Sequence, residues 1–359
     1  MLLSFWSAVG NVWHAAWPYL VAVLFFGIVI MVHETGHFAF ARLFKVRVNA
    51  FALGMGPPIA KFGKGETEYS LRLFPIGGYC KMEGEDEVST DERAFSKKPV
   101  WQRFIIVSAG AAVNLLLGLV IVAVMLAQQN LIATTQIRSF TPDAPSMASG
   151  LAENDKILKI NGRRVFSQYD ISFLMARDKD AVMDFTVERG GKTVEVDAVR
   201  FQTGKEDGQR YIVYDFKVIG VEPGFASVLK YAFLETFSLA RIIWLGLFDL
   251  VTGQYGLADL SGPIGVVTYI AHAAGASTKT DFTPLLSLTA LITINLGIFN
   301  LLPVPALDGG RLFFMLIEAV RRKPVPAKYE NWIHAAGLVL LLIFMAFISL
   351  NDILRLIRG

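Results

Sequence analysis

The sequence is poor in charge and almost without cysteine. Asp, Glu, Lys and Arg make up 18% of the 359 residues, whereas 53% are hydrophobic, a balance typical of membrane proteins. The single cysteine, Cys80, excludes an internal disulfide framework and a zinc site built from cysteines. The net charge of +3 is too small to indicate a nucleic-acid partner. The composition therefore predicts contact with a lipid bilayer and no nucleic acid.

Lysine and arginine are also missing from the first stretch, Met1 to Pro18. A cleaved signal peptide begins with a positively charged region, so the first hydrophobic segment is expected to stay in the mature protein. That segment, Tyr19–Phe44, is long enough to cross the hydrocarbon core, which needs about 20 residues at ~1.5 Å each.

His33, Glu34 and His37 lie inside this first segment as the pattern HETGH. A glutamate in a membrane helix is costly unless it is paired, protonated or facing a polar cavity. Two histidines four residues apart lie one above the other on a helix, where their ring nitrogens can hold one metal ion. The spacing is the H-E-x-x-H pattern of zinc peptidases, whose glutamate is the general base. The alternative is a chance match in which the histidines bond to neighbouring helices.

Three further hydrophobic runs predict membrane helices, so the fold class is a polytopic α-helical membrane protein with four spans. They cover Phe104–Leu126, Pro284–Leu302 and Ala335–Leu350. Asn114, in the second run, suits either a hydrogen bond between helices or a role in a site. One more apolar stretch, Phe225–Val251, carries its polar residues on one side. It is expected to lie in the membrane interface instead of crossing.

Charge in the loops predicts the orientation of the spans. The loops Arg42–Arg103 and Arg311–Lys328 are rich in Lys and Arg, so the positive-inside rule places both in the cytosol. Both termini are then outside, and the HETGH motif lies toward the cytosolic end of the first span.

The first cytosolic loop contains a predicted β-hairpin from Val46 to Met82. Two near-alternating stretches flank the turn-like FGKGE, and several glycines and prolines interrupt them. These interruptions suit a hairpin that bends back toward the membrane, although an ordinary cytosolic hairpin fits the spacing equally well. The interrupting residues include Gly54, Gly56, Pro57, Gly77 and Gly78.

Residues 128–223 have a soluble composition and short strand patterns around one helix near Tyr169–Ala176. Within them, the segment APSMASGLAENDKILKINGRRV resembles the corresponding stretch of a PDZ domain. PDZ domains add an extended peptide to a sheet edge, so a peptide-reading or gating module outside the membrane is predicted. A purely structural β domain is the alternative.

Asp308 is a candidate third metal ligand. It follows the third span in NLLPVPALDGGRLFF, at the cytosolic edge of the membrane and level with the histidine pair. Catalytic zinc commonly takes three protein ligands, and a carboxylate is what the HETGH helix lacks. Prolines 303 and 305 and Gly309-Gly310 break the helix there, which suits a loop that presents a side chain. Taken alone, Asp308 also suits capping of a membrane helix.

HETGH, the PDZ-like insert, SGPIG at Ser261–Gly265 and NLLPVPALDGG together resemble the bacterial site-2 proteases, and more narrowly the regulator-of-sigma-E protease group. The resemblance covers almost the whole chain. It implies a bacterial plasma-membrane zinc metalloprotease in which His33, His37 and Asp308 bind Zn²⁺ and Glu34 is the base. It also implies that Asn300 contacts the substrate backbone or the developing oxyanion.

The resemblance further implies that the hairpin clamps an unwound substrate as an added strand, with Gly54, Gly56, Pro57, Gly77 and Gly78 as candidates for substrate contact. The expected substrates are single-span membrane proteins already shortened outside, such as anti-sigma factors or signal-peptide remnants. The PDZ-like domain would then exclude bulky ectodomains or capture a trimmed tail. Two rival functions are a non-proteolytic membrane scaffold with a structural metal and an ion or metal transporter.

The predicted organisation has eight segments. In chain order they are the first span with HETGH (1–45), the cytosolic loop with the hairpin (46–103), the second span (104–127), the PDZ-like domain (128–223), the interfacial helix and a connector (224–283), the third span with the LDG motif (284–310), a cytosolic loop (311–330) and the fourth span (331–359).

Overall fold

The computed structural model describes residues 2–358, except residues 64, 86, 88, 179, 207–208, 254–261 and 278–281. Two compact units make up the chain. Unit 1 comprises Met1–Gly118 and Phe248–Gly359, and unit 2 comprises Leu119–Leu247.

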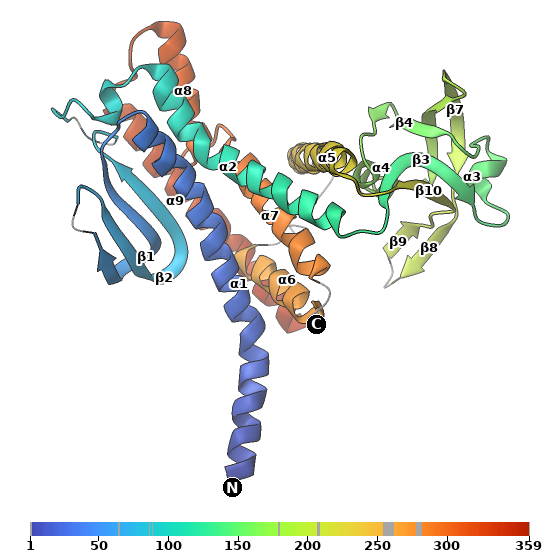
Figure 1. Cartoon of the computed structure of the whole chain (residues 1–359), viewed down its shortest axis with the longest axis horizontal. Helices are drawn as coiled ribbons and strands as arrows, with labels where there is room; N and C mark the ends of the chain where they lie inside the picture. The colour runs from blue at the N-terminus through green and yellow to red at the C-terminus, as the bar shows by residue number, and fades with distance from the viewer. Residues whose placement is uncertain are drawn as a thin grey trace. The chain divides into compact units, whose positions relative to one another are not determined.

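Unit 1 is built on long apolar helices (Figure 1). Its elements are α1 (Leu2–Leu43), β1 (Val48–Phe62), β2 (Glu68–Met82), the 3₁₀ helix η1 (Phe95–Lys97), most of α2 (Val100–Ala127), α6 (Pro263–Ala276), α7 (Thr283–Asn300), α8 (Asp308–Arg321) and α9 (Ala327–Arg358).

Four helices of the described chain are long and apolar enough to cross a membrane: Ala16–Leu43, Val100–Ala127, Thr283–Asn300 and Lys328–Arg355. They match the four predicted spans to within a few residues at most of their ends, because long uncharged runs leave the helix as the only way to satisfy the backbone in lipid. α5 (Phe225–Val251), the stretch predicted to lie in the interface, is not among these four helices.

The predicted hairpin is present as the antiparallel pair β1 and β2, which lies beside α1 (Figure 1). Gly54, Gly56 and Gly77 have φ values of +86°, +86° and +84°, a region that L-residues with a side chain rarely adopt. The register between the strands shifts repeatedly around these positions. The glycines therefore bend the hairpin, as the sequence pattern predicted.

A close backbone contact between membrane helices joins α1 to α2. A Cβ atom added to Gly36 would lie 2.6 Å from the carbonyl oxygen of Ala109, which is shorter than any tolerated contact. The two backbones meet at this point because neither helix places a side chain between them. Small residues give membrane helices this kind of close approach.

α9 is attached to the rest of unit 1 near its two ends. Near its start, Nδ1 of His334 accepts a hydrogen bond of 3.0 Å from the backbone N–H of Ala306. Near its end, the buried carboxylate of Asp352 accepts from the backbone N–H groups of Gly262 and Gly265, at 3.2 and 2.9 Å. Asp352 thereby caps the N-terminus of α6. Most apolar side chains between these ends are exposed.

Two regions contain helices that the sequence did not predict. Part of the connector within 224–283 forms α6. The first part of the loop predicted at 311–330 belongs to α8, which begins at Asp308. α6 has 14 residues, too few for a span, and its cap comes from Asp352 far along the chain. α8 opens with Asp308-Gly309-Gly310, and glycine is a poor helix former. Ser261 of the SGPIG motif lies outside the described residues.

Unit 2 is a small β domain followed by most of α5. Its main sheet has the order β10-β3-β4-β6-β7, with β5 paired to β4, and the neighbouring strands are antiparallel. The elements are β3 (Ile132–Phe140), α3 (Pro145–Ala148), β4 (Lys156–Ile160), β5 (Arg163–Arg164), α4 (Gln168–Ala176), β6 (Val182–Arg189), β7 (Lys192–Arg200), β8 (Thr203–Glu206), β9 (Gln209–Ile212) and β10 (Phe216–Val221).

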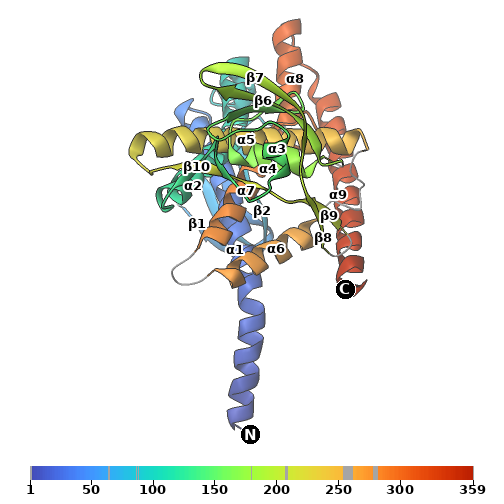
Figure 2. The same ribbon diagram turned by 90° about the vertical axis from the view of Figure 1, so that its right-hand side faces the viewer.

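Polar residues of α5 contact α4 within unit 2. Figure 2 shows this unit facing the viewer. Asp170 in the first turn of α4 is buried, and its carboxylate accepts hydrogen bonds of 2.7 Å from Arg241 and from Ser238. Two of the polar residues that the sequence placed on one side of α5, Ser238 and Arg241, thus face protein, because a buried carboxylate needs a charged partner.

Candidate metal centre

Three side chains of unit 1 converge on one point. His33 and His37 are each 7% exposed, and their Nε2 atoms are 3.1 Å apart. Asp308 places Oδ2 3.1 Å from Nε2 of His33 and 3.2 Å from Nε2 of His37. The structure therefore brings together all three residues that the sequence proposed as metal ligands.

The triangle of ligand atoms fits a single zinc ion. Tetrahedral zinc with bonds of about 2.0–2.1 Å to nitrogen and oxygen holds neighbouring ligand atoms about 3.3 Å apart. Oδ2 of Asp308 is buried and has no hydrogen-bond partner among the described residues. Such an atom is suited to bind a cation, since burial without a partner is costly.

The site keeps Asp308 ionised. Burial alone would raise the pKa of this carboxyl, but the adjacent imidazoles of His33 and His37 lower it well below its usual range. A carboxylate must be deprotonated to bind a metal, so this direction suits the ligand role.

The His37 ring is oriented by the neighbouring helix. Its Nδ1 lies 2.9 Å from the backbone carbonyl oxygen of Ile106 on α2. A carbonyl can only accept, so Nδ1 carries the proton and Nε2 presents its lone pair to the site.

The loop before α8 turns Asp308 toward the histidines. Ala306 has a φ of +77°, and its N–H is the group held by His334 of α9. A Cβ atom on Gly309 would lie 2.0 Å from the carbonyl oxygen of Leu302. The start of α8 therefore folds directly against the end of α7, which requires glycine next to Asp308.

Glu34 lies beside the hairpin. The backbone N–H of Cys80 on β2 is within hydrogen-bonding reach of its carboxylate. A Cβ atom on Gly78 would be 3.2 Å from Cγ of Glu34. The HETGH helix and the hairpin thus meet at the glutamate, a contact that the sequence pattern did not reveal.

The other predicted residues are less closely tied to the metal-ligand candidates. Asn300 is the last residue of α7, and none of the described contacts joins it to His33, His37 or Asp308. Gly54, Gly56 and Pro57 lie along β1, and Gly77 lies next to Gly78 on β2.

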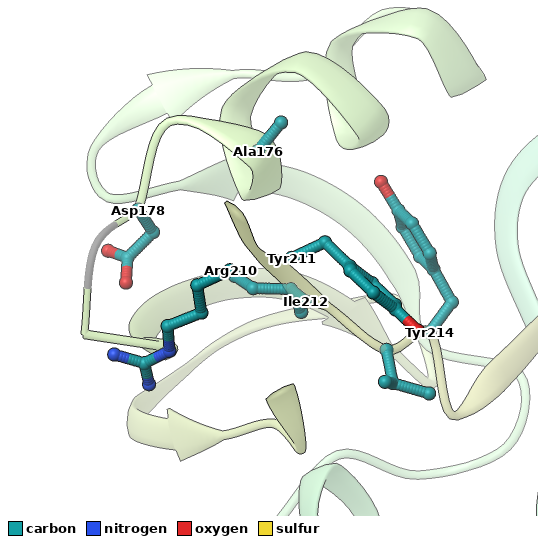
Figure 3. A pocket seen from close by; sticks show the side chains of 7 residues that line it. Ala176, Asp178, Arg210, Tyr211, Ile212 and Tyr214 are labelled. Atoms are coloured by element: carbon teal, nitrogen blue, oxygen red, sulfur yellow. The ribbon is translucent and has the colours of Figure 1, made fainter. Parts of the chain in front are cut away.

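Unit 2 contains a cavity of about 760 Å³ beside the end of α4 and the strand β9 (Figure 3). Asp178 and Arg210 lie on one side of it and the two tyrosines on the other. The hydroxyl of Tyr214 donates a hydrogen bond of 3.4 Å to the carbonyl of Ser172. The cavity is lined by Ala176, Asp178, Arg210, Tyr211, Ile212, Val213 and Tyr214.

The spans indicate a membrane protein, and the two histidines and the carboxylate are ligands typical of zinc. Comparison with known proteins supports both conclusions. The model of Peptidase family M50 matches residues 21–344, so the chain belongs to this family. A protein of Clostridium perfringens named as a zinc metalloprotease is 35% identical over 93% of this chain and 98% of its own length. The regulator of sigma-W protease RasP of Bacillus subtilis is 30% identical over 93% of this chain and 96% of its own.

A similar match joins the chain to the zinc metalloprotease RasP of Geobacillus kaustophilus, at 30% identity over 92% of this chain and 96% of that protein. The protein is therefore a zinc metalloprotease of the site-2 protease family, its cofactor is Zn²⁺, and it acts in a membrane.

Gly110 on α2 gives a first test of the centre. A Cβ atom there would lie 2.4 Å from Nε2 of His37 and 2.8 Å from Cε1 of His33. We expect Gly110→Ala to lower zinc affinity roughly 10-fold or more, as altered ligand orientation commonly does, when measured by chelator competition. Gly27→Ala is the matched control, because nothing lies within 4 Å of its added Cβ. Unchanged affinity in Gly110→Ala would mean that the two rings do not hold the metal as described.

Proposed function

We propose that the protein hydrolyses peptide bonds of single-span membrane proteins or signal-peptide remnants, with zinc held by His33, His37 and Asp308 and with Glu34 as general base. The observation that carries the proposal is the convergence of three ligand atoms, 3.1–3.2 Å apart, two of which come from a membrane helix that also bears Glu34. Zinc bound there would polarise the scissile carbonyl and lower the pKa of the attacking water.

Glu34 is the proton carrier of the proposed reaction. Its carboxylate follows His33 on the same helix and takes the proton of the attacking water. It then passes the proton to the nitrogen of the leaving amine, so the charge created by attack is removed as the bond breaks. The N–H of Cys80 orients the carboxylate from the side of β2.

The hairpin is proposed to bind the substrate as an added strand. A helical substrate hides its scissile carbonyl in its own hydrogen bonds and must unwind before attack. Pairing with β1 or β2 would replace the lost bonds. Support comes from the contact of Gly78 with Glu34, which brings the hairpin to the proposed base. Asn300 is proposed to contact the substrate backbone, as the family resemblance implies.

A transporter would spread its polar groups along the spans. Here the histidines, Glu34 and Asp308 gather at one depth, with a strand backbone at the glutamate, and this arrangement favours chemistry at a single point. The rival scaffold function would have no use for Glu34.

Metal content and turnover should separate the proposed roles. We expect Glu34→Gln to keep about one zinc per chain while cleavage of a single-span model substrate stops, because the base is lost but no ligand is. Asp308→Ala should lose most of the zinc. Glu235→Gln, a matched change at a buried glutamate of α5, should alter neither. Full zinc content in Asp308→Ala would remove that residue from the ligand set, and normal turnover in Glu34→Gln would refute its role as base.

The proposed orientation places both termini outside and the metal centre near the cytosolic side of a bacterial plasma membrane. Lys and Arg in the loop before α2 and in the α8–α9 region support it through the positive-inside rule. Within unit 1, α1 and α9 run in opposite directions (Figure 1), as an even number of crossings requires.

Cysteine labelling tests this orientation in intact cells. In a Cys80→Ser background, a cysteine replacing exposed Arg355 should react with a membrane-impermeant reagent, and one replacing exposed Lys323 should react only after the membrane is opened. The Cys80→Ser protein without an added cysteine is the control. Burial, with Glu34 and Glu85 nearby, raises the pKa of the Cys80 thiol, so the unmodified protein should stay unlabelled as well. Reaction of both cysteines from outside would contradict the orientation.

The β domain of unit 2 is proposed to be the PDZ-like module predicted from the sequence. Its order of strands leaves β10 at one edge of the sheet, as peptide addition requires. The role that we favour is exclusion of substrates with bulky ectodomains, and capture of trimmed tails is the alternative.

Replacing residues 132–221, from β3 to β10, by a short linker distinguishes the two roles. Exclusion predicts that the shortened protein still cleaves trimmed substrate and now cleaves untrimmed substrate as well. Tail capture predicts weaker cleavage of trimmed substrate and no gain on the untrimmed form. A deletion protein with full zinc content that still rejects untrimmed substrate would count against exclusion.

A further inference from the structure

Asn114 on α2 is a fully buried amide next to the metal centre. Its exposed fraction is 0%, and its Nδ2 lies 3.4 Å from Nδ1 of His33. Its Oδ1 is buried and has no hydrogen-bond partner among the described residues. A buried amide oxygen without a partner in a membrane helix is costly, so its placement requires a reason.

The chemistry of a metal-binding imidazole supplies that reason. A neutral histidine that binds a metal through Nε2 carries its proton on Nδ1, which must then donate. His37 meets this condition through the carbonyl of Ile106. For His33, the group next to Nδ1 is the side chain of Asn114. An Asn Nδ2 cannot accept that proton, whereas its Oδ1 can.

A half turn of the amide exchanges its oxygen and nitrogen, which have nearly the same shape. With Oδ1 turned toward His33, the Nδ1–H has an acceptor and the buried oxygen has a donor. One rotation thus satisfies both groups.

We propose that Asn114 is a positioning residue of the zinc site, accepting a hydrogen bond from Nδ1–H of His33 and so fixing the tautomer and the plane of this ligand. The inference rests on the proposed ligand role of His33. Ile106 and Asn114 lie two turns apart on α2, so one helix orients both rings of the HETGH motif. Partners of this kind raise the basicity of the ligating nitrogen.

An alternative is that Asn114 only joins helices. The reverse hydrogen bond, from Nδ2–H to Nδ1 of His33, would serve that purpose equally well, but it would put the imidazole proton on Nε2 and block metal binding. The direction of the bond therefore separates the two roles, and a residue that can only accept tests it.

The experiment compares Asn114→Asp, Asn114→Leu and the control Asn295→Leu in the full-length protein. Asn295 is an asparagine of the neighbouring helix α7, also with a buried Oδ1 that has no partner among the described residues. Zinc affinity is measured by chelator competition, and the visible spectrum of the Co²⁺-loaded protein reports the geometry of the ligands.

Asn114→Asp should bind zinc at least as tightly as the unmodified protein and keep its cobalt spectrum, because the carboxylate accepts from Nδ1–H. Asn114→Leu should bind zinc about 10- to 100-fold more weakly, with an altered spectrum, and the Asn295 variant should be unchanged. The Asp variant keeps the test decisive if the Leu variant fails to fold.

The proposal is overturned if Asn114→Leu keeps full affinity, if Asn114→Asp loses as much affinity as Asn114→Leu, or if Asn295→Leu weakens binding equally. Failure of the underlying ligand assignment gives a different result. In that case His33→Ala would bind zinc as tightly as the unmodified protein, whatever the Asn114 variants do.

Discussion

The close approach of α1 and α2 is the contact on which the candidate metal centre depends. At Gly36 the two backbones meet without an intervening side chain, and Gly110, at the same contact, leaves room for both imidazole rings. This spacing lets the carbonyl of Ile106 and the amide of Asn114 reach the far nitrogens of His37 and His33. A wider spacing would leave polar rings in an apolar interior without partners, which is the least tolerable state in a membrane.

A second constraint is that the polar groups around the candidate centre contact elements that are far apart in the sequence. Glu34 of α1 meets the backbone of Cys80 in the hairpin, and Asp308 of α8 completes the histidine pair. The loop that carries Asp308 is in turn held by His334 of α9. The centre is thus a meeting point of four segments, and its geometry depends on how unit 1 packs as a whole.

Much of this arrangement was predictable, because its signals are local. HETGH fixes two rings on one face of a helix, long uncharged runs identify the spans, and the prolines and glycines around Asp308 indicate a break after the third span. The remaining features arise from distant pairs. Nothing near Asp352 indicates that it caps α6, and nothing near Cys80 indicates that its N–H meets Glu34, because each partner is brought there only by tertiary packing.

The attachment of α9 near its two ends links the candidate centre to the thickness of the bilayer. His334 and Asp352 are separated by about 27 Å along the helix axis, at ~1.5 Å per residue, close to the ~30 Å of a hydrocarbon core. The apolar residues between them are mostly exposed. A thinner or thicker membrane must therefore tilt α9 or strain one of its two attachments, and one attachment holds the loop that carries Asp308. Lipid chain length is thereby coupled to the position of a proposed zinc ligand.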